Sequence, residues 1–263
     1  MAGPRLLIDQ VLGVGVGLTL GEAEARHVGA VLRLSVGDVL RVFNASDGEW
    51  RARVSTKTRR GMGVQVEALL RPARAVPDLD LLFAPVKRHA TDLIVEKATE
   101  LGVRRVRPVI TQRTIAETVR LDRLSGIARE AAEQTERFDA PTIVEPVSLA
   151  RALDGWDEAR ALIYCDEGGD APPILDALQP PSRGEGPRVV GKRDNPPTLL
   201  RAGGVAVLIG PEGGFTLEER KMLHSLSFVM PVSLGPRILR AETAAVAALS
   251  IVQAVWGDWR SGA

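Results

Sequence analysis

The sequence has little cysteine, few aromatic side chains and almost no net charge. Its single cysteine, Cys165, excludes a disulfide within the chain and is typical of a reducing compartment. Because Cys165 follows a run of apolar residues, we expect a buried strand residue and not a nucleophile. Aromatic residues make up only 4% of the chain, which argues against a broad stacking surface for single-stranded RNA. The formal net charge of +1 by itself gives no information about binding to nucleic acid.

Several functional signatures are also missing. No apolar stretch approaches the ~20 residues that cross a bilayer, and the first residues lead into no apolar core with a cleavage site. We therefore expect a cytoplasmic protein. His27, His89 and His224 lie far apart, so no metal site is expected. The chain has no Gly-x-x-x-x-Gly-Lys-Ser/Thr loop, which argues against a kinase or NTPase.

Basic residues gather in the first part of the chain. Residues 1–74 contain eleven basic and seven acidic residues, and the run from Arg51 to Arg60 contains no acid. Alternating apolar residues predict strands over 39–43, 50–54 and 64–68, with one helix over 24–32. Short strands at this spacing favour a small β-barrel. Its local positive charge fits phosphate binding, although a solvated strand face would have the same composition.

The pattern changes after a predicted linker at 72–78. Strands and helices then alternate, which favours an α/β domain with a mostly parallel sheet. Residues 180–204 are rich in proline, glycine, arginine and serine, and we interpret them as a surface insertion. The predicted strands cover 79–84, 103–110, 159–165, 205–209 and 229–234, and the predicted helices cover 92–101, 121–137, 217–225 and 241–256.

Two loops follow predicted strands and could carry chemistry. In the first, a buried strand runs into Gly210-Pro211-Glu212-Gly213-Gly214, and Thr216 can then cap the next helix. In the second, a strand ends at Gly235-Pro236 before a charged turn and a helix rich in small residues. Ligands bind at the carboxyl ends of strands in open α/β sheets, and glycine lets the main chain approach a ligand closely. A tight strand–helix turn is the alternative for either loop taken alone.

Several segments in a fixed order carry a resemblance to a known family. They are Arg26-His27, Val31-Leu32-Arg33, Gly37-Asp38, Lys87, Glu96 to Val103, Pro108, Arg113, Glu133-Gln134, Arg137, Ile209 to Phe215 and Leu234 to Ala244. On these segments the chain resembles the RsmE family of 16S ribosomal RNA uridine-N3 methyltransferases, within the SPOUT superfamily. The family has Ser-Gly where this chain has Thr135-Glu136, and the segment 180–204 is longer here.

The resemblance implies the architecture and the cofactor site. We expect a PUA-like RNA-binding β-barrel over residues 1–72 and a SPOUT α/β trefoil-knot domain over 78–263. The knot loops of the family hold S-adenosylmethionine. Carried over by position, the cofactor residues are Leu208, Ile209, Gly210, Pro211, Glu212, Gly213, Leu234, Gly235, Arg237, Ile238, Leu239, Thr243 and Ala244.

The same resemblance implies methylation of uridine 1498 in the 16S rRNA of the small subunit, by a homodimer. A fixed arginine near the uracil oxygens would stabilise the uridinate, and Arg137 is the first candidate, ahead of Arg113 and Arg240. Glu130, Glu133 and Glu242 are candidate bases, although bulk water could take the proton. Expected RNA-binding residues are Arg26, His27, Arg33, Arg51, Arg53, Lys87, Arg88 and Lys97.

Two alternatives stay open at this point. The first is an RNA-binding assembly factor without activity, which would have no need to retain glycine loops beside Arg237 and Glu242. The second is a SPOUT enzyme that methylates a ribose 2′-hydroxyl. The Glu133-Gln134…Arg137 segment and the run Lys97-Ala98-Thr99-Glu100 favour the base methylator.

Overall fold

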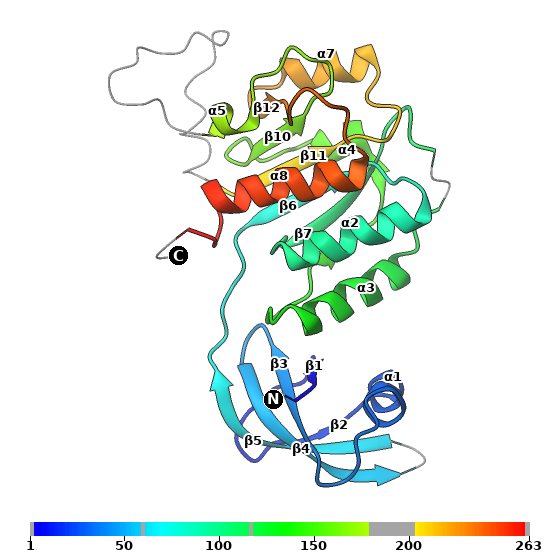
Figure 1. Cartoon of the computed structure of the whole chain (residues 1–263), viewed down its shortest axis with the longest axis vertical. Helices are drawn as coiled ribbons and strands as arrows, with labels where there is room; N and C mark the ends of the chain where they lie inside the picture. The colour runs from blue at the N-terminus through cyan, green and yellow to red at the C-terminus, as the bar shows by residue number, and fades with distance from the viewer. Residues whose placement is uncertain (1–2, 59–60, 116–117, 179–202, 261–263) are drawn as a thin grey trace. The chain divides into compact units, whose positions relative to one another are not determined.

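The computed structural model describes residues 3–58, 61–115, 118–178 and 203–260, which form two compact units (Figure 1). The first unit comprises Met1–Ala75 with Arg129–Ala140, and the second comprises Val76–Ala128 with Pro141–Ala263. The segment 129–140 therefore packs with the first unit, although residues of the second unit precede and follow it in the chain. The insertion expected at 180–204 lies almost wholly outside the described residues.

The first unit is built on a five-stranded sheet. Its strand order is β1-β3-β4-β5-β2, and every pair is antiparallel except β1 with β3. The strands expected over 39–43, 50–54 and 64–68 are confirmed, and β4 and β5 extend further than expected. The strands are β1 (Arg5–Leu7), β2 (Gly17–Thr19), β3 (Val39–Asn44), β4 (Gly48–Thr58) and β5 (Gly61–Arg71).

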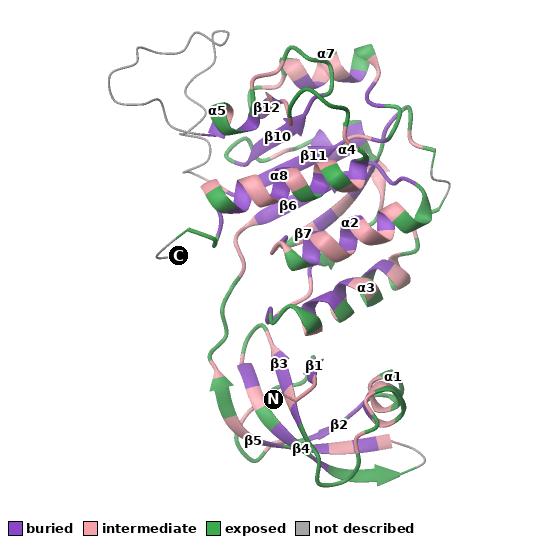
Figure 2. Ribbon diagram, in the orientation of Figure 1, coloured by how far each residue is buried: buried purple, intermediate pink, exposed green. Residues whose placement is uncertain are grey.

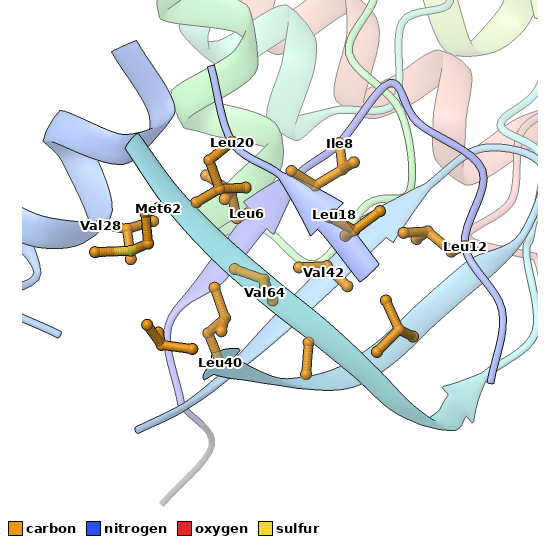
Figure 3. Packing of buried hydrophobic residues seen from close by; sticks show 13 residues of the cluster. Leu6, Ile8, Leu12, Leu18, Leu20, Val28, Leu40, Val42, Met62 and Val64 are labelled. Atoms are coloured by element: carbon orange, nitrogen blue, oxygen red, sulfur yellow. The ribbon is translucent and has the colours of Figure 1, made fainter. Parts of the chain in front are cut away.

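Alternate strand residues build the core of this unit. Leu40 and Val42 from β3 meet Val64 from β5, and Leu18 and Leu20 cover them from the β2 segment (Figure 3). Since side chains alternate across a strand, the residues between them face outward and are polar or charged. The core cluster contains 13 buried residues. Each large apolar side chain among them contributes about 1.5–3 kcal/mol of hydrophobic stabilisation.

The helix expected over 24–32 is present in a different form. Residues Glu22–Arg26 form α1, and His27–Val31 then form a π-helical turn, η1. In this turn the Leu32 amide donates to the His27 carbonyl five residues earlier, which widens the helix. Only Val28 of the turn is buried, so one side chain anchors it to the barrel-like core.

The second unit contains a seven-stranded sheet in which all pairs are parallel. Its order is β12-β10-β11-β6-β7-β8, with β9 also pairing with β7. The strands are β6 (Leu79–Phe83), β7 (Arg105–Ile110), β8 (Thr142–Ile143), β9 (Val147–Ser148), β10 (Ala161–Cys165), β11 (Val205–Ile209) and β12 (Val229–Val232). Every residue of β6, β10 and β11 is buried (Figure 2). Burial on both faces explains the continuous apolar sequences of β10 and β11, whereas β6 also contains the buried Asp80.

Helices cover both faces of this sheet. The α4 and α7 side packs against Leu82, Leu162 and Leu208, while α8 packs against α2 and β11. The helices are α2 (Arg88–Glu100), α3 (Leu121–Gln134), α4 (Leu149–Leu153), α5 (Ile174–Leu178), α7 (Leu217–Ser225) and α8 (Ala241–Val255). No helix of the described residues is long and apolar enough to span a membrane.

The expected fold class is confirmed: an α/β unit with a mostly parallel sheet follows a barrel-like sheet. The predicted helix 217–225 matches α7 at both ends. After β12, at the edge of the sheet, the chain returns to α8 beside β11 and α2. The expected trefoil knot depends on this return, since simple doubly wound sheets do not bring the last segment back across their own strands.

Candidate functional site

The two glycine-containing loops leave the same edge of the parallel sheet. One follows β11 and runs from Gly210 to Thr216, and the other follows β12 and runs from Ser233 to Arg240. Strand β10 lies between β11 and β12, so its last residues stand between the two loops. Because all three strands are parallel, their carboxyl ends meet where open α/β sheets bind ligands.

The loop after β11 is tight enough to require its glycines. A Cβ on Gly210 would lie 2.6 Å from the Phe215 ring. Gly214 has φ +67°, and a Cβ there would collide with the Glu167 carboxylate. Only glycine takes up this backbone without strain. The loop therefore presents main chain at its outer surface, where Glu212 and Gly213 are exposed.

Two acidic side chains stabilise this loop by accepting hydrogen bonds from backbone amides. Glu167, just beyond β10, accepts a hydrogen bond from the Phe215 amide at 3.2 Å. Glu219 exchanges capping hydrogen bonds with Thr216 and also accepts one from the Gln112 amide at 2.8 Å. The expected cap at Thr216 is therefore confirmed. Glu219 is buried and joins the start of α7 to the segment after β7.

Arg113 lies directly against the exposed part of the loop. Its Nη1 donates to the Gly213 carbonyl at 2.7 Å. Its Cβ and Cδ lie 3.5 and 3.6 Å from the position that a Cβ on Gly213 would occupy. The structure thus brings one of the three candidate arginines to the β11 loop.

A buried carboxylate at the end of β10 organises the region between the two loops. Asp166 accepts hydrogen bonds from Arg220 at 3.0 and 3.1 Å, from the Gly168 amide at 3.0 Å and from Tyr164 Oη at 3.2 Å. His224 Nε2 lies 2.9 Å from the second Asp166 oxygen. Burial raises the Asp166 pKa, but the bonds from Arg220 and His224 outweigh it and leave the pKa below its ordinary value.

The loop after β12 is open. Gly235 has φ +109°, and no atom lies within 4 Å of the position that a Cβ on it would occupy. Ile238 is 88% exposed. Arg240 is the N-cap residue of α8 without a side-chain cap bond, and Glu242 lies in the first turn of α8. Arg240 and Glu242 therefore belong to the same unit as the β11 loop, at the start of the small-residue helix.

The first-choice arginine, Arg137, lies in the other unit. It is buried, and its Nη2 is 2.8 Å from Asp139 Oδ1. Arg5 donates to its carbonyl at 3.0 Å. The candidate base Glu133 also lies in the first unit, where it accepts a bond from the Leu7 amide at 3.0 Å. Burial raises the pKa of Glu133.

Four of the eight expected RNA-binding residues have acidic partners. Arg51 and Arg53 both pair with Glu67, at 2.9 and 2.7 Å. Arg26 pairs with Glu22 at 2.9 Å. Lys97 contacts Glu100 and Glu96, both at 2.7 Å. The hydrogen bond that it donates to Glu100 is the largest cause of the rise in its pKa.

The remaining expected cations are differently placed. Among the described residues, Lys87 and Arg88 have no acidic partner, and both are exposed at the start of α2. Arg33 has φ +57°, in the left-handed region, directly after the π-helical turn that contains His27. Arg59 and Arg60 of the basic run lie outside the described residues.

Comparison with known proteins decides the family. Residues 74–253 match the family model described as an RNA methyltransferase domain, and residues 20–65 match an RNA methyltransferase PUA domain. The ribosomal RNA small subunit methyltransferase E of Rickettsia conorii is 30% identical over 227 residues, which cover 86% of this chain and 85% of that protein. The chain belongs to the RsmE family.

Solved structures agree over nearly the whole chain. A Legionella pneumophila protein solved with bound cofactor SAM has a TM-score of 0.82 and 29% identity, covering 98% of this chain and 100% of that one. The ribosomal RNA small subunit methyltransferase E of Neisseria gonorrhoeae, bound to S-adenosyl methionine, has a TM-score of 0.81 and 26% identity, with the same coverage. The expected family is confirmed.

Sequence reasoning missed the side chains that support the RsmE-type loops. Asp166, Glu167 and Arg220 carry no motif, and only the position of Asp166 and Glu167 directly after a buried strand could have singled them out. Cys165 is buried in β10 as expected, and burial raises its pKa to about 12. Within the described ranges no group of His, Cys, Asp or Glu could hold a metal ion.

Proposed function

We propose that this chain transfers a methyl group from S-adenosylmethionine to N3 of a uridine in 16S ribosomal RNA. The observation that carries the proposal is the family match over 74–253, which includes both glycine-containing loops. The solved relatives from Legionella pneumophila and Neisseria gonorrhoeae hold this cofactor, and each covers 98% of the chain. An assembly factor without activity would have no need to retain a cofactor loop.

The β11 loop fits a cofactor that is held by main-chain groups. Gly210 and Gly214 cannot carry a Cβ without collision, so the backbone is the surface that a ligand would meet. We assign the cofactor to Leu208–Gly213 of this loop and to Leu234, Gly235, Arg237, Ile238 and Leu239 of the β12 loop, with Thr243 and Ala244 on α8. When bound, the cofactor supplies an electrophilic methyl group on a sulfonium.

The protein must favour the uridinate, because N3 of uridine carries a proton and is a poor nucleophile. A guanidinium held near the uracil oxygens would stabilise the charge that develops when this proton leaves. Arg113 is a candidate for this role because it donates a hydrogen bond to the β11 loop. Arg240 and Glu242 are further candidates and lie at the start of α8. Arg137 remains a candidate for the same role, with its guanidinium held by Asp139. Alignment of the reacting atoms would supply about 7–11 kcal/mol.

The finer organisation is also proposed. Residues 1–72 would bind RNA and residues 78–263 would carry the cofactor and the chemistry. The substrate would be the assembled small subunit, which places the protein in the cytoplasm. A homodimer is supported by exposed apolar side chains near α8: Ile238 is 88% and Val246 36% exposed. Light scattering of the purified protein measures its oligomeric state directly.

Methyl transfer can be tested with small subunits from a strain that lacks the modification. We expect labelled methyl from S-adenosylmethionine to appear as 3-methyluridine in nucleoside mass spectrometry. Arg113→Ala and Arg137→Ala are compared, and removal of one such stabilising donor lowers kcat about 10²–10³-fold. Calorimetry of cofactor binding separates the two possible causes of a lower rate. Loss of uridinate stabilisation leaves the cofactor affinity unchanged, whereas loss of the contact between Arg113 and Gly213 lowers it.

The outcomes separate the alternatives. Label on ribose would retain the fold and contradict base methylation. RNA binding with neither cofactor binding nor methyl transfer would favour the assembly-factor alternative. Free 16S rRNA, used in parallel, shows whether the assembled subunit is required.

A further inference from the structure

A crevice of about 590 Å³ opens in the second unit beside the cofactor loop. It lies beyond the carboxyl ends of β6 and β7, and Glu212 of the β11 loop forms one side. The described lining residues are Pro85, Val86, Lys87, Arg88, Thr91, Asp92, Ile115, Thr118, Val119, Arg120, Arg123, Leu124 and Glu212.

The topology of the sheet marks this place. Strands β6 and β11 are neighbours, but the chain leaves β6 toward β7 on one side and leaves β11 toward α7 and β12 on the other. Connections that diverge from adjacent parallel strands open a crevice, where doubly wound sheets bind their ligands. None of the residues assigned to the cofactor lies on the β6 side of this crevice.

The charges at the crevice differ in their availability. Arg123 pairs with Asp92, and Arg120 contacts Asp122 at 2.9 Å. Among the described residues Lys87 and Arg88 have no such acid, and both side chains are exposed. They stand at the N-terminus of α2, where Lys87 is the N-cap residue without a side-chain cap bond. Two available cations and the open amides of a 13-residue helix make this end of the crevice suited to an anion.

Apolar side chains also line the crevice. Ile115 is 79% exposed although it is large and aliphatic, and Val119 and Leu124 line the crevice with it. A volume of about 590 Å³ suits a ligand of small-molecule size. One nucleotide fits such a space and a duplex does not. A nucleotide can enter only if it is unpaired or flipped out of its stack.

We propose that this crevice receives the RNA nucleotide that is to be methylated. Lys87 and Arg88 bind its phosphate, and the base lies along Ile115 and Val119 toward Glu212 and the cofactor loop. This inference rests on the proposed function, because it assigns the RNA side of the same reaction centre. It gives Lys87 and Arg88 the role of substrate binding, separate from the main-chain recognition of the cofactor.

The test compares two double variants of the full-length protein. Lys87→Ala/Arg88→Ala removes the crevice cations, and Arg151→Ala/Lys221→Ala removes two exposed cations elsewhere in the same unit. Binding of small subunits that lack the modification is measured over a range of salt concentrations. Loss of the two cations that bind this one phosphate should reduce the slope of log affinity against log salt by about one. The control pair should leave the slope unchanged.

Cofactor binding is measured on the same proteins by calorimetry with S-adenosylmethionine alone. We expect unchanged cofactor affinity for both double variants. Equal losses of cofactor and RNA affinity in the crevice variant would overturn the proposal and make the crevice part of the cofactor site. An unchanged salt slope would overturn it as well.

Ile115→Ala tests the apolar side. Here KM for small subunits should rise while the salt slope stays at the wild-type value, since no charge is removed. An unchanged KM would contradict the placement of the base. The salt slope needs no methyl transfer, so an inactive wild-type protein would refute the proposed function and still leave the crevice measurable.

Discussion

Two groups of cations, one in each compact unit, differ in their surroundings. In the first unit Arg5, Arg41 and Arg71 converge on Glu49, which is 1% exposed. Arg5 also donates to the carbonyls of Ala132 and Glu133, each at 3.0 Å, and so caps the end of α3. In the second unit Lys87 and Arg88 stand exposed beside a crevice.

This difference means that the excess of positive charge in the first part of the chain overstates the number of cations without an acidic partner. The basic stretch that suggested phosphate binding contains Arg51 and Arg53, and both side chains pair with Glu67. Their partner lies on the neighbouring strand β5, so one carboxylate across the sheet partly compensates the charges of these two residues. Lys87 and Arg88, by contrast, lie in a part of the chain whose composition is ordinary.

The strongest test of this contrast is Glu49→Gln. Loss of the shared carboxylate leaves Arg5 buried without a counter-charge, and breaking a buried pair in this way costs about 3–5 kcal/mol. Hydrogen exchange of peptides from β3 to β5 should accelerate accordingly. The matched control is Glu22→Gln, whose pair with Arg26 is exposed and contributes about 0.2–1 kcal/mol. Equal effects of the two substitutions would mean that the buried Glu49 network stabilises the protein no more than an exposed ion pair does.

A second test concerns the backbone of the second unit. Gly214→Ala introduces a Cβ against Glu167 at φ +67°, and a left-handed backbone costs a residue with a side chain about 1–2 kcal/mol. If that strain displaces the β11 loop, S-adenosylmethionine affinity falls about tenfold. Calorimetry measures the affinity and thermal unfolding the stability.

The control for this loop is Gly126→Ala. Gly126 lies in α3 with open space around a Cβ, so alanine should stabilise the helix by about 0.5–1 kcal/mol. Unchanged cofactor affinity in Gly214→Ala would show that the loop tolerates the side chain, and that main-chain geometry does not determine the site.

The sequence predicted the elements that have a strong period. Helix α7 begins after a capping Thr216, and strand β11 is a continuous apolar run, so both were bounded correctly. Strands β1 and β2 have three residues each, and β8 and β9 have two, which is too short to show alternation. The return of the chain to α8 has no local signal and came only from the family resemblance.

The long-range contacts of both units could not be predicted for a different reason. Arg5 and Glu49 are 44 residues apart, and Arg5 and Arg137 are 132 apart. Such pairs exist only after strands β1 and β4 have been placed in one sheet. The glycine loops were found because their backbone demand is local, whereas Asp166 and Arg220 are joined by tertiary packing alone.

The departure at Thr135-Glu136 gives the finest test of the first unit's network. Glu136 has φ +63° just after α3, where the family has glycine, and its carboxylate contacts Arg41 at 3.3 Å and Arg71 at 2.9 Å. Backbone strain and two half-exposed ion pairs therefore oppose each other at one residue. Exposed pairs of this kind contribute about 0.2–1 kcal/mol each, and the left-handed conformation costs about 1–2 kcal/mol.

Two substitutions separate these terms. Glu136→Gln removes the ion pairs and keeps the strain, so it should lower the free energy of unfolding. Glu136→Gly removes both, and it should be more stable than Glu136→Gln by about 1 kcal/mol after the entropy cost of glycine. Urea unfolding at low and high salt measures the difference. Salt should lower the stability of the wild type relative to both variants and leave the difference between the two variants unchanged. If Glu136→Gly were the less stable variant, the strain at this residue would be outweighed by the contacts of the side chain. The side chain itself would then hold residues 129–140 in place.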